Sequence, residues 1–380
     1  MLPKIKKFAL TRFEYRFDRS IGDSQVFFEN SHSVALELHD DAGNIGLGFG
    51  HKLFEPYPSQ ATMEATFAKY IWPELEGQTA IELAQRVERP RGGNQRDAKY
   101  GFDEALQIAL WDLASQQASM PLGKFLGGTR EKVRAYASGL DFHMSDEEFV
   151  EFFSNAASHG FDTFKIKIGS PDPEWDLHRL ELLKKTVGPD CGIMADANEA
   201  WSCKEAAMRL TMFHDAGIDL IWIEDPILRN DFAGLRSLRQ MAPFTQINSG
   251  EYLGLTGKRM LLQAGGTDII NVHGRVSDTM RIGWLAADMG LPVSLGNTFL
   301  ETGVHAACAL PEVEWLEYSF LSNEHLVDTP IEFKDGYALL PEKPGVGFAL
   351  SDAARKIWSA PDPVAADALK TAPPCRFISK

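Results

Sequence analysis

The stretch Phe164-Lys165-Ile166-Lys167-Ile168 alternates three apolar side chains with two lysines. Alternation with a period of two is typical of a β-strand and places both lysines on the same face. In a parallel barrel, the apolar face would contact the surrounding helices and the lysines would point into the lumen. An amphipathic strand with solvated lysines is the alternative, but a parallel-barrel strand has no solvated face. We therefore expect both lysines at the mouth of a barrel.

Short apolar segments alternate with longer amphipathic segments on both sides of this stretch, from about residue 133 to residue 318. This alternation predicts βα units around a parallel sheet. Ser145 and Glu148 fit a capping box at the start of the first helix. Eight parallel strands in this length favour an α/β fold with a TIM (β/α)8 barrel, and a doubly wound sheet is the main alternative. The expected strands cover residues 135–138, 163–168, 192–197, 220–224, 245–249, 268–272, 292–295 and 314–318.

The segments that flank the barrel have different patterns. Residues 5–50 alternate like antiparallel strands with turn residues at 40–44, and residues 103–118 carry an apolar helical face. Residues 331–333 and 337–340 look like a hairpin that returns to the N-terminal domain, and the last twenty residues look like a loose tail. We predict an N-terminal α+β domain at 1–130, the barrel at 131–325, and a C-terminal segment at 326–380 that returns to the N-terminal domain.

Composition limits the possible partners. The 380 residues include 38 basic and 53 acidic side chains, a net charge of −15 without any basic run, so we expect no nucleic-acid and no membrane partner. The N-terminus has no apolar signal core, and no stretch approaches the ~18 apolar residues that span a bilayer, which predicts a soluble, cytoplasmic protein. Four scattered cysteines without C-x-x-C spacing indicate neither a disulfide framework nor a zinc-thiolate site.

Three consecutive predicted strands each end in a carboxylate. Asp196, Glu224 and Glu251 are separated by 28 and 27 residues, about one βα unit each, and Asn198 shares a face with Asp196. Converging carboxylates repel one another unless a cation lies among them, and an all-oxygen ligand set favours Mg²⁺ over zinc. We expect one Mg²⁺ per site. The alternative, in which the acids only cap the following helices, would account for one or two of them.

These motifs together resemble the enolase superfamily, on its mandelate racemase and muconate-lactonising branch. The resemblance covers nearly the whole chain, and its specificity comes from the order and spacing of common motifs. They are Ala109-Leu110-Trp111-Asp112-Leu113, Pro121-Leu122, Leu126-Gly127-Gly128, Lys165-Ile166-Lys167, Asp196-Ala197-Asn198, Glu224-Asp225-Pro226, Gly250-Glu251, Trp315-Leu316-Glu317 and Pro344-Gly345-Val346-Gly347.

The resemblance implies a modified barrel of (β/α)7β type under a capping domain, with Asp196, Glu224 and Glu251 as metal ligands. It also implies that a base removes the proton α to a substrate carboxylate while Mg²⁺ holds the enediolate, a feature already known of this superfamily. By motif position Lys167 would be the base. Lys165 would lower the pKa of its neighbour by like-charge repulsion and bind the substrate carboxylate.

The chain departs from the family patterns at several positions. Residues 292–297 contain no histidine where the racemase pattern ends its seventh strand with one, and His273 stands where the lactonising pattern has a lysine. His273 could be an acid or base on the opposite face of the site, or a hydrogen-bonded residue at a strand end. Glu317 matches a position that binds the substrate carboxylate, or it stabilises the barrel. Gly50 is followed by His51, where family members often have glutamate.

Further contacts are expected from the capping domain, which closes over the barrel mouth in this family. Arg19, His51 and Tyr57 are polar or aromatic side chains in its expected loops, and Asp225 is a candidate supporting residue beside the metal ligands. The remaining histidines, including His305, are interpreted as structural or surface residues.

We therefore expect a homo-oligomeric Mg²⁺-dependent enzyme that acts on a small carboxylate substrate and dehydrates a sugar acid. The alternative within this chemistry is a racemase, epimerase or cycloisomerase of a carboxylic acid or amino-acid derivative that uses Lys167 and His273. A catalytically silent binding protein is a third possibility, which the presence of both lysines and all three carboxylates disfavours. Fold alone does not decide among these, because one barrel hosts many reactions.

Overall fold

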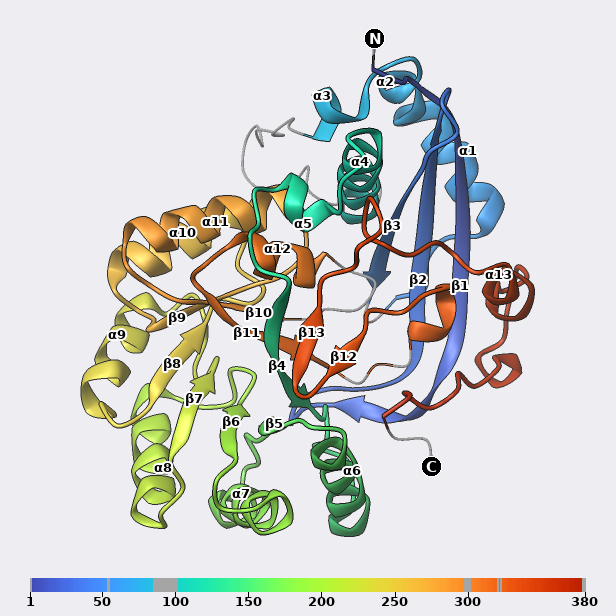
Figure 1. The fold of residues 1–380 in the computed structure, drawn as a ribbon. Helices are drawn as coiled ribbons and strands as arrows, with labels where there is room; N and C mark the ends of the chain where they lie inside the picture. Colours follow the sequence, from blue (N-terminus) through green and yellow to red (C-terminus); the bar gives the residue numbers. More distant parts are fainter. Residues whose placement is uncertain are drawn as a thin grey trace.

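The structure is a computed structural model, and it describes residues 2–52, 55–84, 102–296, 302–319, 321 and 323–377. The chain begins with an antiparallel sheet in the order β1-β2-β3, as the alternation predicted. Figure 1 shows its long strands standing to one side of the barrel. The strands are β1 (Ile5–Gly22), β2 (Phe27–Asp40) and β3 (Ile45–Lys52).

A closed barrel of eight parallel strands follows the antiparallel sheet. Its strands pair in sequence order, and β11 pairs with β4, which closes the sheet and excludes a doubly wound fold. All eight predicted strands are confirmed, with ends shifted by up to three residues. They are β4 (Lys132–Ser138), β5 (Thr163–Lys167), β6 (Gly192–Asp196), β7 (Leu220–Glu224), β8 (Gln246–Ser249), β9 (Ile269–Val272), β10 (Val293–Leu295) and β11 (Val313–Tyr318).

Helices follow the barrel strands and cover the outer face of the barrel (Figure 1). The predicted capping box is confirmed, since Ser145 Oγ accepts from Glu148 N and Glu148 Oε2 accepts from Ser145 N. None of the helices in the described ranges is long and apolar enough to cross a membrane. These barrel helices are α6 (Asp146–Ser158), α7 (Pro173–Val187), α8 (Cys203–Asp215), α9 (Phe232–Met241), α10 (Leu255–Ala264), α11 (Val276–Asp288) and α12 (Gly303–Ala309).

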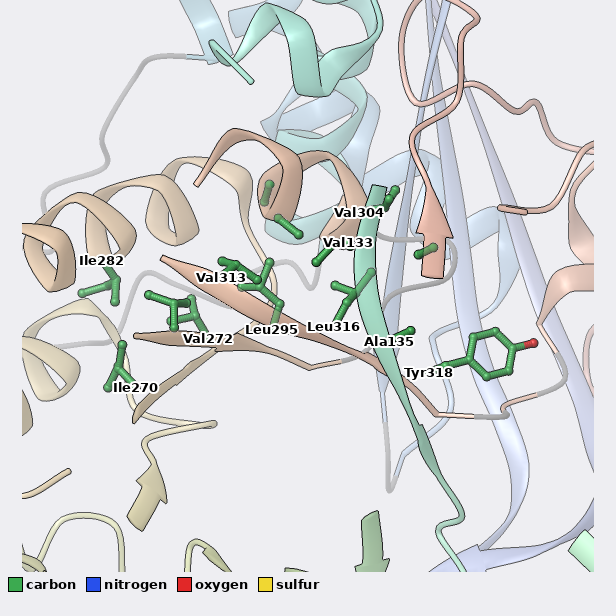
Figure 2. Packing of buried hydrophobic residues seen from close by; sticks show 14 of the residues in the cluster. Val133, Ala135, Ile270, Val272, Ile282, Leu295, Val304, Val313, Leu316 and Tyr318 are labelled. Atoms are coloured by element: carbon green, nitrogen blue, oxygen red, sulfur yellow. The ribbon is translucent and has the colours of Figure 1, made fainter. Parts of the chain in front are cut away.

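The main hydrophobic core lies between the barrel strands and these helices. Phe164, Ile166 and Ile168 are fully buried in it, so the alternating stretch turns its apolar face toward the helices as predicted. Figure 2 shows another part of this core, where Val272 of β9 lies near Ile282 of α11 and Leu295 of β10 lies beside Leu316 of β11.

The capping helices connect the antiparallel sheet to the barrel. Helix α4, predicted at 103–118, packs directly against β3, because a Cβ at Gly48 would lie only 2.0 Å from Ala105 O. The fully buried Asp112 carboxylate accepts hydrogen bonds from Leu47 N and Val346 N, which ties α4 to β3 and to the C-terminal segment. The capping helices are α1 (Gln60–Tyr70), α2 (Trp72–Leu75), α3 (Ala80–Ala84), α4 (Asp103–Gln117) and α5 (Leu122–Phe125).

The C-terminal hairpin differs from its prediction. Strands β12 (Phe333–Lys334) and β13 (Tyr337–Leu339) join the barrel sheet, and β13 pairs antiparallel with β4 instead of with the capping sheet. The physical reason is the register of β4: its neighbour β5 begins pairing only at Ala137, so the first residues of β4 leave backbone groups on that edge that β13 satisfies.

The prediction of a loose tail is wrong up to residue 377. Arg16 N donates to Lys370 O, and Ala372 N donates to Arg16 O, so the tail pairs with the open edge of β1. Cys375 and Phe377 are buried in the main core. The tail is held in place by pairing with the edge of β1 and by the burial of Cys375 and Phe377, although its composition predicted a loose segment. Between β11 and the end of the described chain lie also α13 (Asp352–Trp358) and two 3₁₀ turns, η1 (Glu324–Leu326) and η2 (Ala366–Ala368).

His305 links the last barrel helix to the capping region. Its Nδ1 accepts from Gly123 N at 3.0 Å and its Nε2 donates to Val346 O at 3.1 Å, so the neutral ring satisfies both groups. Burial lowers the pKa of His305 to about 4. A structural role, as predicted, therefore fits its contacts.

This buried histidine should make the protein less stable in acid. The unfolded chain takes up a proton at His305 below about pH 6.5, whereas the folded protein resists until about pH 4, so stability is lost as the pH falls. This group alone should lower the free energy of unfolding by about 2 kcal/mol between pH 7 and pH 5. Urea unfolding of wild type and His305→Gln at both pH values measures the difference. Equal pH dependence in the two proteins would contradict the prediction, and His143→Gln, at an exposed position, is the control.

Candidate active site

The side chains inside the barrel form two layers. Toward the start of the strands, an apolar layer fills the lumen, and Tyr136 and Trp222 meet edge to face at 5.4 Å between ring centroids. Two residues further along each strand, the same inward face becomes polar or charged, as alternation requires. The apolar layer consists of Tyr136, Met194, Trp222 and Ile269, with Ile221 and Trp315 packed against it.

Lys165 lies at the centre of the charged layer. Its Nζ is 2.6 Å from Glu224 Oε2, 3.0 Å from Glu317 Oε1 and 3.8 Å from Asp196 Oδ2. Burial alone would lower the pKa of Lys165, but these carboxylates outweigh it and hold the pKa well above its usual range. Lys165 is therefore a fixed positive charge, which excludes the solvated alternative for the alternating stretch.

Lys167 lies one step closer to the mouth. Its Nζ contacts Asp196 Oδ2 at 2.5 Å and Asn198 Oδ1 at 2.8 Å. Burial lowers the pKa of Lys167, and Lys165 lowers it further as predicted, but Asp196 and the carboxylates of Glu224 and Glu251 outweigh both and raise it. In this arrangement the amine is charged, so the expected neutral base is not the state of the lysine here.

The three predicted metal ligands meet the two lysines. Register places Lys167 beside Asp196 and Asp196 beside Glu224 on neighbouring strands, and Glu251 follows the end of β8. Oxygens of Glu224, Asp225 and Glu251 lie within 4.8 Å of one another. Asp196 is not part of that group, and one of its oxygens contacts the ammonium group of Lys167. The predicted ligands and the cluster in the structure therefore share Glu224 and Glu251, but the cluster contains Asp225 in place of Asp196.

The chemistry of these residues fits a divalent cation. Burial raises the pKa of Glu251 to about 7, and burial together with neighbouring acids raises the pKa of Glu224 well above its usual range. Carboxylates that are buried this closely favour protonation unless positive charge is supplied. Oxygen-only ligands of this kind suit Mg²⁺. Asp196, Glu224 and Glu251 could hold it, with Asp225 as a competing member.

Asp225 also has other partners. Its Oδ1 accepts from Ser249 Oγ and Gly250 N, and its Oδ2 lies 3.2 Å from Arg229 Nη2. Asp225 has a φ of 36°, in the left-handed region that is costly for a non-glycine residue. These bonds hold the strained turn in place beside Glu224 and Glu251, which is consistent with a supporting role.

A cavity of about 670 Å³ lies between the barrel mouth and the capping sheet. Both lysines, Asn198 and Glu251 line it from the barrel, together with Glu317. His273 enters it from the end of β9, where its ring meets Tyr252 edge to face at 5.4 Å. From the capping sheet, the cavity is lined by Asn30, Ser31, His32, His51 and Lys52.

Burial gives both histidines neutral rings. Burial lowers the pKa of His273 to about 4, and the charges of Lys258 and Arg229 lower it further. His51 has a pKa lowered by burial to about 4, and its Nδ1 lies 2.9 Å from Ser33 Oγ. Near pH 7, each ring can accept a proton or a hydrogen bond but is a weak proton donor.

Two predicted substrate contacts lie away from the cavity. Arg19 donates to Gly139 O at 2.6 Å and stacks over Phe152, so it connects β1 to the barrel. Tyr57 is 4% exposed and belongs to the main core. Arg19 therefore packs between the domains, and Tyr57 packs within the core, so each amphipathic side chain is used for packing.

Three residues beside the site were not predicted from the sequence. Arg229 bridges Glu199 and Asp225 and lies over the Tyr252 ring, and its position four residues after Asp225 was a usable signal. Lys258 donates to the carbonyls of Gly250, Glu251 and Asn271, which ties the ends of β8 and β9 together. Glu104 of α4 lines the cavity, and no local sequence pattern indicates this.

Comparisons with known proteins agree with this geometry. The crystal structure of a protein from Mesorhizobium loti, described as a candidate mandelate racemase, is 53% identical, covers 98% of this chain and 99% of its own, and superposes with a TM-score of 0.94. L-talarate/galactarate dehydratase from Salmonella typhimurium is 30% identical over 67% of this chain and 64% of its own length. L-Ala-D/L-Glu epimerase from Bacillus subtilis is 27% identical over 83% and 88%. Other relatives are named as cycloisomerases.

Fold and site together define a capped barrel protein with lysines and carboxylates gathered at the barrel mouth. A family model described as enolase C-terminal domain-like matches residues 148–354, more than half of the chain. The chain therefore belongs to the enolase superfamily, on the mandelate racemase and muconate-lactonising branch. Its relatives include acid-sugar dehydratases, epimerases and cycloisomerases. A solved structure of the Salmonella dehydratase, 23% identical with a TM-score of 0.81, is liganded with magnesium and L-lyxarohydroxamate.

Proposed function

We propose that this protein removes the proton α to the carboxylate of a sugar acid and then eliminates a β-hydroxyl as water. The observation that carries the proposal is the placement of Lys167, a buried amine that reaches the cavity beside Asp196 and Asn198. Asn198 has a φ of 46°, so a strained turn holds its side-chain oxygen 2.8 Å from the lysine. An amine fixed in this way can reach an α-carbon that is bound in the cavity.

Lys165 provides the charge that binds the substrate carboxylate. It is 2% exposed and remains charged because Glu224 and Glu317 surround it. Magnesium held by Asp196, Glu224 and Glu251 would stabilise the negative charge that develops on the substrate and lower the pKa of Lys167. Proton removal at such a weakly acidic carbon depends on concentrated positive charge of this kind.

Dehydration needs one base and one acid, and this requirement favours it here. His273 is a neutral ring near pH 7, and the seventh strand has no histidine, so the site has no strongly matched pair of bases across the carbon. The polar lining from the capping sheet, with Asn30, Ser31 and Lys52, suits a hydroxylated substrate. The similarity to L-talarate/galactarate dehydratase supports the same reaction class.

Racemisation, epimerisation or cycloisomerisation is the second candidate, and one observation favours it. Lys167 is the last residue of β5 and His273 follows β9, and these strands are four positions apart in an eight-strand barrel. The two side chains therefore approach the cavity from opposite sides, as a two-base reaction requires. The epimerase relative is consistent with this candidate.

A substrate screen in deuterated buffer tests the proposal. Mono- and di-acid sugars, amino-acid derivatives and proline analogues are incubated with protein and Mg²⁺, and α-proton exchange, keto acid and optical rotation are measured. We expect exchange and a 2-keto-3-deoxy acid from at least one sugar acid. Optical change or ring closure without keto acid would support the second candidate. Absence of exchange with every compound would favour a binding protein.

A further inference from the structure

The capping domain contributes a carboxyl group to the cavity next to His273. Glu104 lies in the first turn of α4 and lines the same cavity as Lys167 and Glu251. Its position is fixed by the turn after β9, since a Cβ added at Gly274 would lie 3.5 Å from Glu104 Oε1. Gly274 has a φ of +91°, so the absence of a side chain there leaves room for the carboxyl group.

Helix α4 is attached to the barrel at this point, which gives Glu104 a defined position. Gln107 Oε1 accepts from Ser277 N at 3.0 Å, and Trp111 Nε1 donates to Ser277 Oγ at 3.2 Å. These two residues lie three and seven positions after Glu104 on α4, and Ser277 is in the first turn of α11. The N-terminal end of the helix therefore lies at the barrel mouth beside β9.

Glu104 is better suited to donate a proton than His273 or Glu251. Burial raises the pKa of Glu104 to about 7, more than Arg275 lowers it. His273 is neutral near pH 7, and Glu251 belongs to the metal-binding set. A carboxyl group near neutrality is a suitable general acid.

We propose that Glu104 is the catalytic acid that protonates the departing β-hydroxyl of the substrate. The inference rests on the proposed dehydration and adds a residue from the capping domain to it. It places the base on β5 and the acid above the end of β9, on opposite sides of the barrel.

The proton and electron balance of the step is closed. Lys167 takes the α-proton, and the electron pair of that C–H bond forms the double bond of the enediolate. The enediolate then collapses: the carboxylate re-forms, a double bond forms between the α- and β-carbons, and the β-carbon–oxygen bond breaks. The oxygen keeps the pair of that bond, takes the proton of Glu104 and leaves as water, which gives an enol. The enol tautomerises to a 2-keto-3-deoxy acid, with one proton lost from oxygen and one gained at carbon. Lys167 releases its proton to solvent and Glu104 regains one.

The Glu104→Gln variant separates this step from enolisation. In the full-length protein with Mg²⁺ and the sugar acid found in the screen, we expect keto-acid formation to fall by about 10² to 10⁴-fold, because a general acid is lost. Exchange of the α-proton with deuterated solvent should stay within about threefold of wild type, because Lys167 is unchanged. Glu82→Gln, an exposed acid on α3, is the matched control and should keep both rates.

Several outcomes would overturn the assignment. Keto-acid formation close to the wild-type rate in Glu104→Gln excludes Glu104 as the acid, and loss of exchange together with turnover in a folded variant assigns it to binding or enolisation. If Glu104→Gln does not fold, Glu104→Asp is used, which draws the carboxyl back by one methylene and should lower elimination but not exchange. Wild-type protein that exchanges no substrate contradicts the proposed function itself. Wild type that exchanges but forms only an epimer contradicts dehydration and this role together.

Discussion

We expect the Lys167→Ala variant to lose both turnover and exchange of the substrate α-proton. Loss of a general base costs about 10² to 10⁴-fold in rate, and no other group of the described site combines an amine with this position. The fold should persist, because Lys165 remains 3.8 Å from Asp196 and keeps positive charge beside it. Exchange is followed by NMR in deuterated buffer, and turnover is followed by keto-acid formation.

Lys185→Ala is the matched control for this prediction, because Lys185 is exposed on α7. It removes the same charge and should leave both rates unchanged. Persistent exchange in Lys167→Ala would transfer the role of base to another group. His273→Asn then becomes informative: loss of exchange in that variant would identify His273 as the base.

The second large effect is expected at the metal ligands. Glu224→Gln should weaken Mg²⁺ binding by at least about 100-fold, since even outer-sphere partners of a metal cost 10- to 100-fold when they are removed. Little change in melting temperature is expected, because the ligands are attached to a prebuilt barrel. Titration calorimetry with Mg²⁺ measures the affinity. Unchanged affinity in Glu224→Gln would exclude the site, and Glu147→Gln, at an exposed position on α6, controls for the charge change.

Two further variants decide between the predicted ligand and its competitor. If Asp196 is a ligand, Lys167 must release its oxygen when Mg²⁺ binds. In that case Asp196→Asn should remove Mg²⁺ binding. Asp225→Asn should mainly lower the melting temperature, because Asp225 accepts from Ser249 and Gly250 and pairs with Arg229. The reverse result would make Asp225 the third ligand.

Local patterns were sufficient for the barrel and for the charged layer. The lysines follow the alternation of β5, and β6 and β7 each end in an acid, so Lys165, Lys167, Asp196 and Glu224 could be placed by counting along single strands. The parallel register then brings equivalent positions of neighbouring strands to one height. The capping box at Ser145 is local in the same way.

Predictions from local sequence patterns were wrong where the contacting segment lies far away in the sequence. Arg19 and Tyr57 had suitable chemistry, but both side chains are used for packing. The hairpin was misplaced and the tail was wrongly predicted to be loose, because the open edges of β4 and β1 that pair with them lie hundreds of residues away. Nothing in the sequence around Glu104 indicates a cavity, since its surroundings come from β9.

The sequence by itself determined the barrel, the inward direction of the two lysines, and the carboxylates at or just after the ends of β6, β7 and β8, because strand alternation and βα spacing are properties of a short segment. Only the tertiary structure decided the protonation of the site and the identity of its neighbours. Lys167 is charged because Asp196 lies 2.5 Å away, and His273 is neutral because it is buried near Lys258 and Arg229. Burial and charge in a folded site depend on every element that surrounds it, and no single segment of the chain contains that information.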